Sequence, residues 1–269
     1  MRTALTIAGS DSSGGAGIQA DLRTFCALGV YGTCAITAIT AQNRTGVSAM
    51  EPLPADLVTA QIEAVAGDLE IHATKIGMLA TAAIVEAVAA AIEELDLPLV
   101  VLDPVLASTS GRRLLDLDGV QMLITELLPR VRVITPNVPE AEALSGHRIS
   151  SMDGARDAAR RLHDMGAAAV IIKGGHGAWA RDRVRSAVVD LLFDGRAFHE
   201  SRVRRVTVDP SAGIAGATMP LRGTGCAFAS ALAAHLALGH DLPDAAALAQ
   251  RHVARLIARA SPRTYTERR

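Results

Sequence analysis

Short apolar runs alternate along the chain with longer stretches rich in alanine and leucine. A short apolar run bounded by turn residues is typical of a buried strand, whereas a longer stretch with helical periodicity is typical of a helix. The apolar runs predict strands at residues 3–8, 33–40, 73–76, 99–102, 131–135, 168–172, 187–193 and 197–206. The longer stretches predict helices at residues 16–27, 54–68, 80–95, 119–127, 138–144, 152–165, 225–238 and 243–260.

The order of these elements indicates an α/β fold. Most of the predicted strands are apolar on both faces and are separated by helices, which is typical of a mostly parallel sheet covered on both sides. Between the last two strands, Asp194-Gly195 is a hairpin signal and predicts an antiparallel pair at one edge of the sheet. No internal repeat or linker interrupts the chain, so we expect residues 1–269 to form a single domain.

Composition and charge exclude several classes of function. Of 269 residues, 49% are hydrophobic and 20% charged, which is enough to form a large core. A net charge of -1 and an aromatic content of 3% argue against nucleic-acid binding. No apolar run has membrane-spanning length, and the first one is too short for a signal peptide. Three cysteines without a C-x-x-C pair favour a reducing cytoplasm.

Ligands of such a sheet bind at the carboxyl ends of its strands, so the polar residues just after each strand are the candidates. The first loop contains Gly15-x-Gly17-x-x-Ala20, a weak match to the dinucleotide fingerprint because the second strand ends without an acidic residue. A P-loop motif is absent from the sequence. Asp11 and Asp21 could bind a small substrate, although a turn residue and a first-turn acid are equally simple interpretations.

The next two loops offer a polar group and an apolar one. The amide of Gln42 has both a donor and an acceptor, which suits the edge of a heterocycle, or it belongs to an ordinary polar loop. Met78 is better suited to a pocket wall than to chemistry.

Oxygen-bearing side chains follow the fourth and fifth strands. Asp103 ends a buried strand and therefore needs a partner, either Mg²⁺ or a neighbouring arginine or helix N-terminus. Asn137 and Glu140 are spaced for a capping box, but they also place two oxygens beside Asp103. Together these three residues suit an octahedral Mg²⁺ that keeps several waters.

The chain contains only two lysines, and both lie beside glycines at predicted strand ends. A compact ammonium suits a phosphate where the other cations are arginines. This interpretation is favoured for Lys173, which precedes Gly174-Gly175, whereas for Lys75 chance is as good an explanation.

Residues 223–226 (GTGC) lead into a run of good helix formers. Unpaired backbone N–H groups and the helix dipole make such a helix start an anion site, which Gly223, Thr224 and Gly225 would form. Cys226 lies at the same positive end, where the thiolate is favoured and could accept a proton. The alternative is a glycine-rich loop with a small core cysteine.

Together these motifs resemble those of the hydroxymethylpyrimidine/phosphomethylpyrimidine kinases of thiamine biosynthesis, within the ribokinase-like superfamily. They occur in the family's order between Leu5 and about Ala234: LTIAGSD (5–11), SGGAGIQADL (13–22), ITAQN (39–43), KIGML (75–79), DPV (103–105), TPN-x-x-E (135–140), KGGH (173–176) and GTGC (223–226).

The resemblance implies a three-layer αβα sandwich and transfer of the ATP γ-phosphoryl group to 4-amino-5-hydroxymethyl-2-methylpyrimidine, to its monophosphate, or to both. It implies a homodimer with Mg²⁺ and ATP as cofactor and co-substrate. The implied catalytic residues are Cys226, Gly223, Thr224, Gly225 and Lys173. The implied pyrimidine-binding residues are Gln42, Asp21, Gly9, Met78 and Val105. The implied nucleotide and metal groups are Asn137, Lys173, Gly223 and Gly225 for ATP, and Asp103 and Glu140 for Mg²⁺.

Three departures from the family pattern concern the ATP side of the site. Arg222 stands where the family usually has histidine, and Thr109 stands where it usually has lysine. The segment from residue 207 to 221 is longer than usual and rich in Gly, Ala and Pro, which is typical of a mobile stretch. Because it leads into the anion site, it could act as a lid or could reshape the nucleotide site. Two other functions stay open: a pyridoxal kinase of the same superfamily, and a ligand-binding sensor without catalysis.

Overall fold

The computed structural model describes residues 1–43, 45–108, 111–176, 187–206 and 222–260. A nine-stranded sheet runs through the molecule in the order β3-β2-β1-β4-β5-β6-β7-β8-β9. Its strands are β1 (Thr3–Asp11), β2 (Tyr31–Gln42), β3 (Val47–Pro52), β4 (Ala73–Ile76), β5 (Val100–Leu102), β6 (Val133–Ile134), β7 (Val170–Ile172), β8 (Ala187–Phe193) and β9 (Phe198–Arg204). The six strands from β2 to β7 along the sheet pair in parallel.

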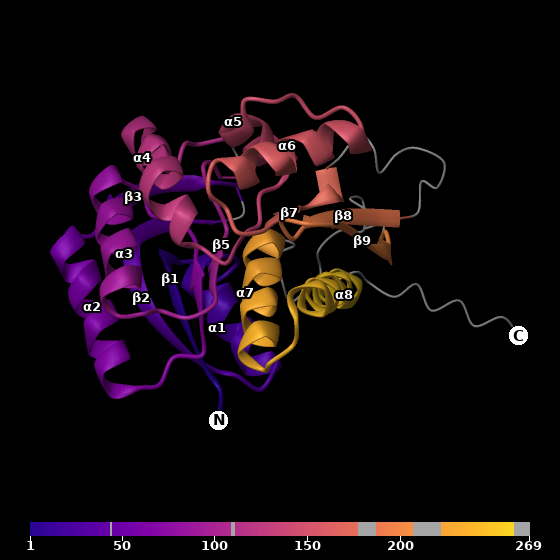
Figure 1. Ribbon diagram of the computed structural model, residues 1–269. Coiled ribbons are helices and arrows are strands. Elements are labelled where there is room, and N and C mark those ends of the chain that lie inside the picture. Colours follow the sequence, from indigo (N-terminus) through magenta and orange to yellow (C-terminus); the bar gives the residue numbers. More distant parts are fainter. Residues whose placement is uncertain (44, 109–110, 177–186, 207–221, 261–269) are drawn as a thin grey trace, which may run out of the picture.

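Helices cover both faces of this sheet, as Figure 1 shows. They are α1 (Gly17–Ala27), α2 (Ala55–Asp68), α3 (Ala82–Glu94), α4 (Leu117–Met122), α5 (Val138–Ser145), α6 (Met152–Asp164), α7 (Thr224–Ala237) and α8 (Leu242–Ala260). One core lies between the sheet and α2, α3, α5 and α6, and the other between the sheet and α1, α7 and α8. The predicted mostly parallel α/β sandwich is therefore confirmed.

Strand alternation assigns side chains to one core or the other. Along β4, β5 and β7, Ile76, Leu102 and Ile172 enter the first core, whereas Val101 and Ile171 enter the second. Because successive side chains point to opposite faces, odd positions near the ends of these strands face α7. The same alternation directs Lys75, Asp103 and Lys173 toward the start of α7.

The two edges of the sheet differ in how well the sequence predicted them. The antiparallel hairpin of β8 and β9 is confirmed at one edge. At the other edge, β3 pairs antiparallel with β2 and was not predicted. Its residues are mostly half-buried or exposed, so they form no apolar run. Arg112 supports this strand by donating to the carbonyls of Val47 and Ser48 at 2.8 and 3.0 Å.

Several element boundaries shift by a few residues from the predictions, including those of one helix and one strand. The helix expected at residues 119–127 begins as α4 at Leu117 and continues as a π-helical turn over Leu123–Leu127. The strand expected from residue 99 begins at Val100, because Leu99 has a positive φ of 45°.

Candidate active site

A cavity of about 550 Å³ opens at the carboxyl ends of the parallel strands. It lies beside the point where the chain order along the sheet reverses, since β1 has β2 on one side and β4 on the other. This is where open α/β sheets bind ligands. The volume is within the range of small-molecule sites. Every predicted site residue except Asp21 lines it.

The start of α7 forms one wall of the cavity. Gly223 has a left-handed φ of 73° and directly precedes the first helical residue, Thr224. The chain can therefore turn sharply while the first amides of α7 stay free for a ligand. A Cβ at Gly225 would lie 3.3 Å from Nζ of Lys173 and 3.8 Å from Oδ2 of Asp103. The glycine motif and these two charged groups thus meet at one point.

Lys173 and Asp103 form an ion pair in the cavity wall. The ammonium nitrogen lies 2.7 Å from Oδ1 of the carboxylate, and the lysine side chain is 13% exposed. Burial alone would lower the pKa of Lys173, but the Asp103 and Glu140 carboxylates raise it, so the lysine stays charged. Asp190 anchors the following loop by accepting the Gly174 N–H at 2.8 Å. The partner of Asp103 is therefore a lysine rather than the arginine or helix N-terminus that the sequence predicted as alternatives to Mg²⁺.

Asn137 and Glu140 form the capping box that their spacing allowed. The Asn137 side chain accepts the Glu140 N–H at 3.0 Å, and the Glu140 carboxylate accepts the Asn137 N–H at 2.8 Å. Both residues also line the cavity. Burial raises the pKa of Glu140 to about 7, while Lys173 opposes that shift and Asp103 adds to it. The structural interpretation of this pair is therefore confirmed, and the same two residues face the cavity.

Cys226 is the third residue of α7 but does not have the acidity expected of it. Desolvation raises the pKa of its thiol to about 11, and Asp103 and Asp21 add to the rise. Lys75 and the Gly17 backbone N–H lower it without cancelling that effect. The expectation of a favoured thiolate was wrong, because neighbouring carboxylates and burial outweigh the helix dipole. The thiol form is therefore favoured, and the thiolate that could accept a proton is the minor form, supported by Lys75.

The end of the cavity away from Lys173 is lined mostly by uncharged residues. Gln42 lines this part of the cavity. Its backbone N–H donates to the Ser12 hydroxyl oxygen at 2.9 Å, and its side-chain oxygen accepts from the Thr40 hydroxyl at 3.3 Å. Met78 and Val105 supply apolar wall. A Cβ at Gly9 would collide with the methyl group of Met78, so the absence of a side chain at Gly9 leaves room for that wall.

Asp21 lies beneath the cavity and does not line it. Its residue is fully buried, and its carboxylate accepts hydrogen bonds from Thr6, Lys75 and Ser230. The expectation that Asp21 contacts the substrate is corrected accordingly. The reason is the helical position of Asp21, which points into the interface of α1 with the sheet and α7. Lys75 is the ion-pair partner of Asp21 and lies at the cavity floor. Its position beside a glycine is therefore not a matter of chance.

Further lining residues carried little signal in the sequence. An apolar patch beyond Lys173 includes Val188, Val203, Val253 and Ala254, from β8, β9 and α8. Arg222 donates to the Asn43 carbonyl and so connects the start of α7 with the Gln42 loop. Thr109 and residues 207–221, including the expected lid, lie outside the described residues.

Comparison with protein families identifies matching relatives. A family model described as phosphomethylpyrimidine kinase matches residues 11–266. The hydroxymethylpyrimidine/phosphomethylpyrimidine kinase of Bacillus subtilis is 46% identical, over 90% of this chain and 84% of its own. A thiamine biosynthesis bifunctional protein of Geobacter sulfurreducens is 43% identical over 96% of this chain, which spans only 49% of that relative.

Solved structures agree with these matches. A phosphomethylpyrimidine kinase of Clostridium difficile superposes with a TM-score of 0.80 at 37% identity, covering 96% of this chain and 100% of that one. A Staphylococcus aureus pyridoxal kinase in complex with AMP-PCP and pyridoxal has a TM-score of 0.78 at 35% identity, covering 94% and 87%. Both likenesses confirm the predicted fold. Over the described residues, no helix has the length and apolarity needed to cross a bilayer.

Proposed function

Because the chain belongs to the phosphomethylpyrimidine kinase family, we propose that it transfers the γ-phosphoryl group of ATP to 4-amino-5-hydroxymethyl-2-methylpyrimidine, to its monophosphate, or to both, in thiamine biosynthesis. One observation carries the proposal. A single cavity joins an anion-binding helix start and the Lys173–Asp103 pair at one end to Gln42, Met78 and Val105 at the other.

The uncharged end of the cavity suits an aminopyrimidine. The Gln42 amide can accept from the exocyclic amino group and donate to a ring nitrogen. Met78, Val105 and the space left by Gly9 fit the flat faces and the methyl group of the ring. Bound in this way, the ring directs its hydroxymethyl group toward the start of α7.

The charged end suits the polyphosphate of ATP. Lys173 is kept protonated by its carboxylate neighbours, and the helix start at Gly223, Thr224 and Gly225 lies against its ammonium. The apolar patch of Val188, Val203, Val253 and Ala254 lies beyond Lys173 and suits the adenine ring. Asn137 lies beside Lys173, to which its backbone is joined by a bridge, and is placed to contact the phosphates.

The transfer itself needs positioning and charge neutralisation more than covalent chemistry. The hydroxymethyl oxygen forms a bond to the γ-phosphorus while the bond from that phosphorus to the β–γ bridging oxygen breaks, leaving ADP. The hydroxyl proton passes to the sulfur of Cys226 in its thiolate form. The amides at the start of α7 and Lys173 stabilise the charge on the transferring group.

The carboxylates present fit a magnesium ion of the kind that ATP brings with it. Asp103 and Glu140 lie close enough for the charge of one to affect the other. No cluster of three or more potential protein ligands exists among the described residues. Mg²⁺ usually takes one or two carboxylates together with phosphates and waters, so this donor set fits it. When bound, the ion would neutralise phosphate charge, with Asp103 and Glu140 holding it directly or through water.

The test is steady-state turnover with three acceptors: the hydroxymethylpyrimidine, its monophosphate and pyridoxal, each with ATP and Mg²⁺. We expect turnover with one or both pyrimidines and a kcat/KM at least about tenfold lower for pyridoxal, because an acceptor that leaves the Gln42 amide unpaired loses binding energy. A preference for pyridoxal would refute the assignment. Background ATP turnover with all three acceptors would instead support a ligand-binding sensor.

Three broader expectations complete the proposal. We expect residues 1–269 to act as one kinase domain, which the single continuous sheet supports. We expect a cytoplasmic location, with which the free thiols of Cys26, Cys34 and Cys226 are compatible. We also expect a homodimer, which light scattering of the purified chain would test.

A further inference from the structure

A complete lysine–aspartate ion pair lies in the core beneath the cavity. Nζ of Lys75 is 2.8 Å from Oδ2 of Asp21, and both side chains are 0% exposed. Burial alone would lower the pKa of Lys75, but Asp21 raises it above its usual value, so the ammonium is permanently charged. Such a pair seldom stabilises a fold better than apolar side chains of similar volume would. Its presence therefore calls for an explanation other than stability.

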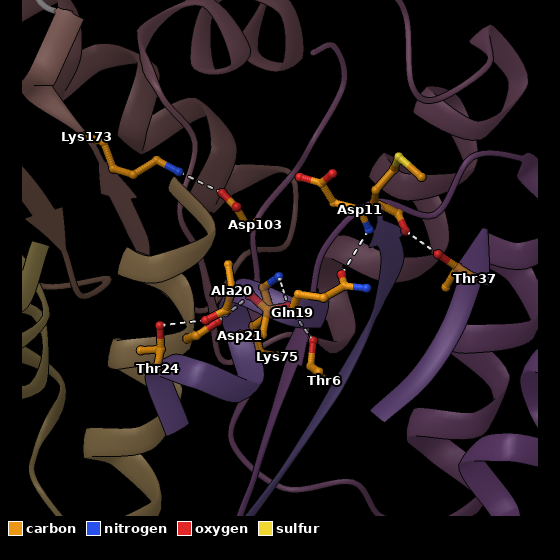
Figure 2. A network of polar contacts seen from close by, with 12 residues as sticks. Thr6, Asp11, Gln19, Ala20, Asp21, Thr24, Thr37, Lys75, Asp103 and Lys173 are labelled. Carbon is orange, nitrogen blue, oxygen red and sulfur yellow. Dashed lines mark hydrogen bonds and ion pairs between the residues drawn. The ribbon is translucent and has the colours of Figure 1, made fainter. Parts of the chain in front are cut away.

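The pair is part of a network that joins the sheet to the helix carrying the thiol. The hydroxyl of Thr6 donates to Oδ2 of Asp21, and that of Ser230 donates to Oδ1, both at 2.7 Å. Thr6 is the register partner of Lys75 on the adjacent strand. Ser230 lies four residues after Cys226 in α7, which places the two on the same side of the helix. Figure 2 shows Thr6, Asp21 and Lys75 converging beneath the Lys173–Asp103 pair.

Lys75 also lies at the floor of the cavity, although its side chain is 0% exposed to solvent. Lys75 and Cys226 both line it, and a Cβ at Gly77 would come within 2.7 Å of Nζ of Lys75. The missing side chain at Gly77 thus leaves the ammonium its space at the carboxyl end of β4.

Charges from four elements act on the thiol. Lys75 on β4 and the backbone N–H of Gly17 in α1 favour its ionised form, while Asp103 after β5 and Asp21 in α1 oppose it. Lys173 after β7 also interacts with the thiol. Among these charged side chains Lys75 has the largest influence, and its own counter-charge, Asp21, faces away from the cavity.

We propose that Lys75 is a positioning residue for proton transfer, whose buried ammonium, fixed by Asp21, places a permanent positive charge beneath Cys226 and favours the thiolate that accepts the hydroxyl proton. The inference rests on the proposed kinase function and adds to it a residue that acts through Cys226. In this arrangement Lys173 binds the phosphates, whereas Lys75 assists the proton transfer through Cys226.

This division of roles between the two lysines predicts that the hydroxymethylpyrimidine and its monophosphate depend to different degrees on the Lys75 charge. The hydroxymethyl group must lose a proton when its oxygen bonds to the γ-phosphorus, and that proton goes to the thiolate. The monophosphate presents an oxygen that is already largely ionised at neutral pH, since the second pKa of a phosphate monoester is about 6. Phosphorylation of the monophosphate therefore needs no comparable proton acceptor, and the charge of Lys75 matters less to it.

The test measures the ionisation of Cys226 directly. Alkylation by iodoacetamide is followed against pH, and the Cys226 peptide is quantified by mass spectrometry so that Cys26 and Cys34 do not interfere. The main variant is the double substitution Asp21→Asn with Lys75→Met, which removes the ion pair without leaving a lone buried charge. Lys75→Gln is a second variant, which keeps a hydrogen bond to Asp21 but lacks the charge. Thr24→Val is the matched control, because its buried hydroxyl bonds only to the Ala20 carbonyl in the same helix.

We expect both variants that neutralise Lys75 to alkylate Cys226 more slowly at pH 8. Lys75→Gln should be slowed about tenfold, corresponding to a rise of one unit in the pKa of the thiol. The double variant should be slowed less, because it also removes the Asp21 carboxylate, which opposes the thiolate. The pH profile of kcat/KM for the alcohol acceptor should move upward by a similar amount, and Thr24→Val should move neither. Unchanged alkylation in folded neutral variants would overturn the proposal. Because alkylation needs no turnover, this failure is distinguishable from failure of the wild-type chain to phosphorylate the pyrimidine.

Ser230→Ala separates charge from helix placement. It removes the hydroxyl bond to Asp21 but keeps both charges. We expect its alkylation profile to match that of the wild type. A shift as large as that of the neutral variants would assign the effect to the placement of α7 and would overturn a role for the Lys75 charge.

Discussion

Two lysine–aspartate pairs lie on the same face of the sheet, yet their surroundings differ. The Lys173–Asp103 pair, with nitrogen and oxygen 2.7 Å apart, opens onto the cavity and keeps part of the lysine exposed. The Lys75–Asp21 pair, at 2.8 Å, is enclosed on all sides. An accessible pair can exchange its partner for a phosphate, whereas an enclosed pair keeps its partner and acts only through its field. Burial, more than distance, therefore determines what each lysine can do.

The largest effect should come from breaking the enclosed pair on one side. Asp21→Asn leaves a buried ammonium without its counter-charge, which costs about 3–5 kcal/mol of unfolding free energy. Urea unfolding measures the loss. Asp103→Asn is the matched control and should cost less, because the Lys173 side chain is 13% exposed and keeps the Glu140 carboxylate as a second counter-charge. Equal losses in the two variants would contradict the distinction drawn between the pairs.

Disrupting the accessible Lys173–Asp103 pair should lower turnover rather than stability. Lys173→Met removes the cation that faces the polyphosphate, and kcat/KM for ATP should fall about 10²- to 10³-fold with little change in stability. Initial rates at varied ATP concentrations measure the effect. Lys173→Arg keeps the charge but not the compact shape and should recover only part of the loss. Near-normal activity in Lys173→Met would remove Lys173 from the phosphate site.

Cys226 lies within the field of both pairs, and replacing it should separate proton transfer from binding. Cys226→Ala should lower kcat for the alcohol acceptor about 10²-fold, the usual scale of general-base catalysis. Pyrimidine affinity, measured by calorimetry, should change less than about twofold, since the ring binds at the other end of the cavity. Cys34→Ala serves as the control thiol. An undiminished rate in Cys226→Ala would show that another group accepts the proton.

Gln42 lies away from both ion pairs, so its replacement should affect only the binding of the pyrimidine ring. Gln42→Leu leaves polar atoms of the bound pyrimidine unpaired, so Kd for the ring should rise about tenfold. The KM for ATP is the internal control and should not change. If ring affinity were unaltered, the pyrimidine would have to bind elsewhere in the cavity.

The smallest effect concerns Glu140, which faces the accessible pair. Its pKa is raised to about 7 in the folded chain, so the folded state binds this proton more tightly than the unfolded state does. The contribution of Glu140 to stability is therefore greatest at low pH and is lost as pH rises toward about 7. Glu140→Gln should flatten that part of the stability–pH curve while retaining the cap on Asn137. Unfolding free energies measured between pH 4.5 and 7.5 would test the slope, and a slope as steep as that of the wild type would assign it to another group.

The fold could be predicted largely from the sequence, because its elements depend on local patterns. The apolar strands, the helices between them and the hairpin at Asp194-Gly195 each carry their signal within a few residues. The edge strand β3 could not be predicted, since backbone pairing with β2 and the contact from Arg112 hold it rather than an apolar face. The capping box of Asn137 and Glu140 is local and was visible beforehand.

By itself, the sequence determined which chemical groups the site contains and that they gather at one edge of a parallel sheet. Local patterns alone predict the strand ends and a helix start after Gly223, and they place the Gln42 amide just after a strand. Only the tertiary structure decided which charges meet: Lys173 with Asp103, and Lys75 with Asp21 beneath the cavity. It also decided that the Cys226 thiol is less acidic than a free one. The reason is that electrostatic energies depend on distance and burial between residues far apart in the chain, and local sequence patterns encode neither.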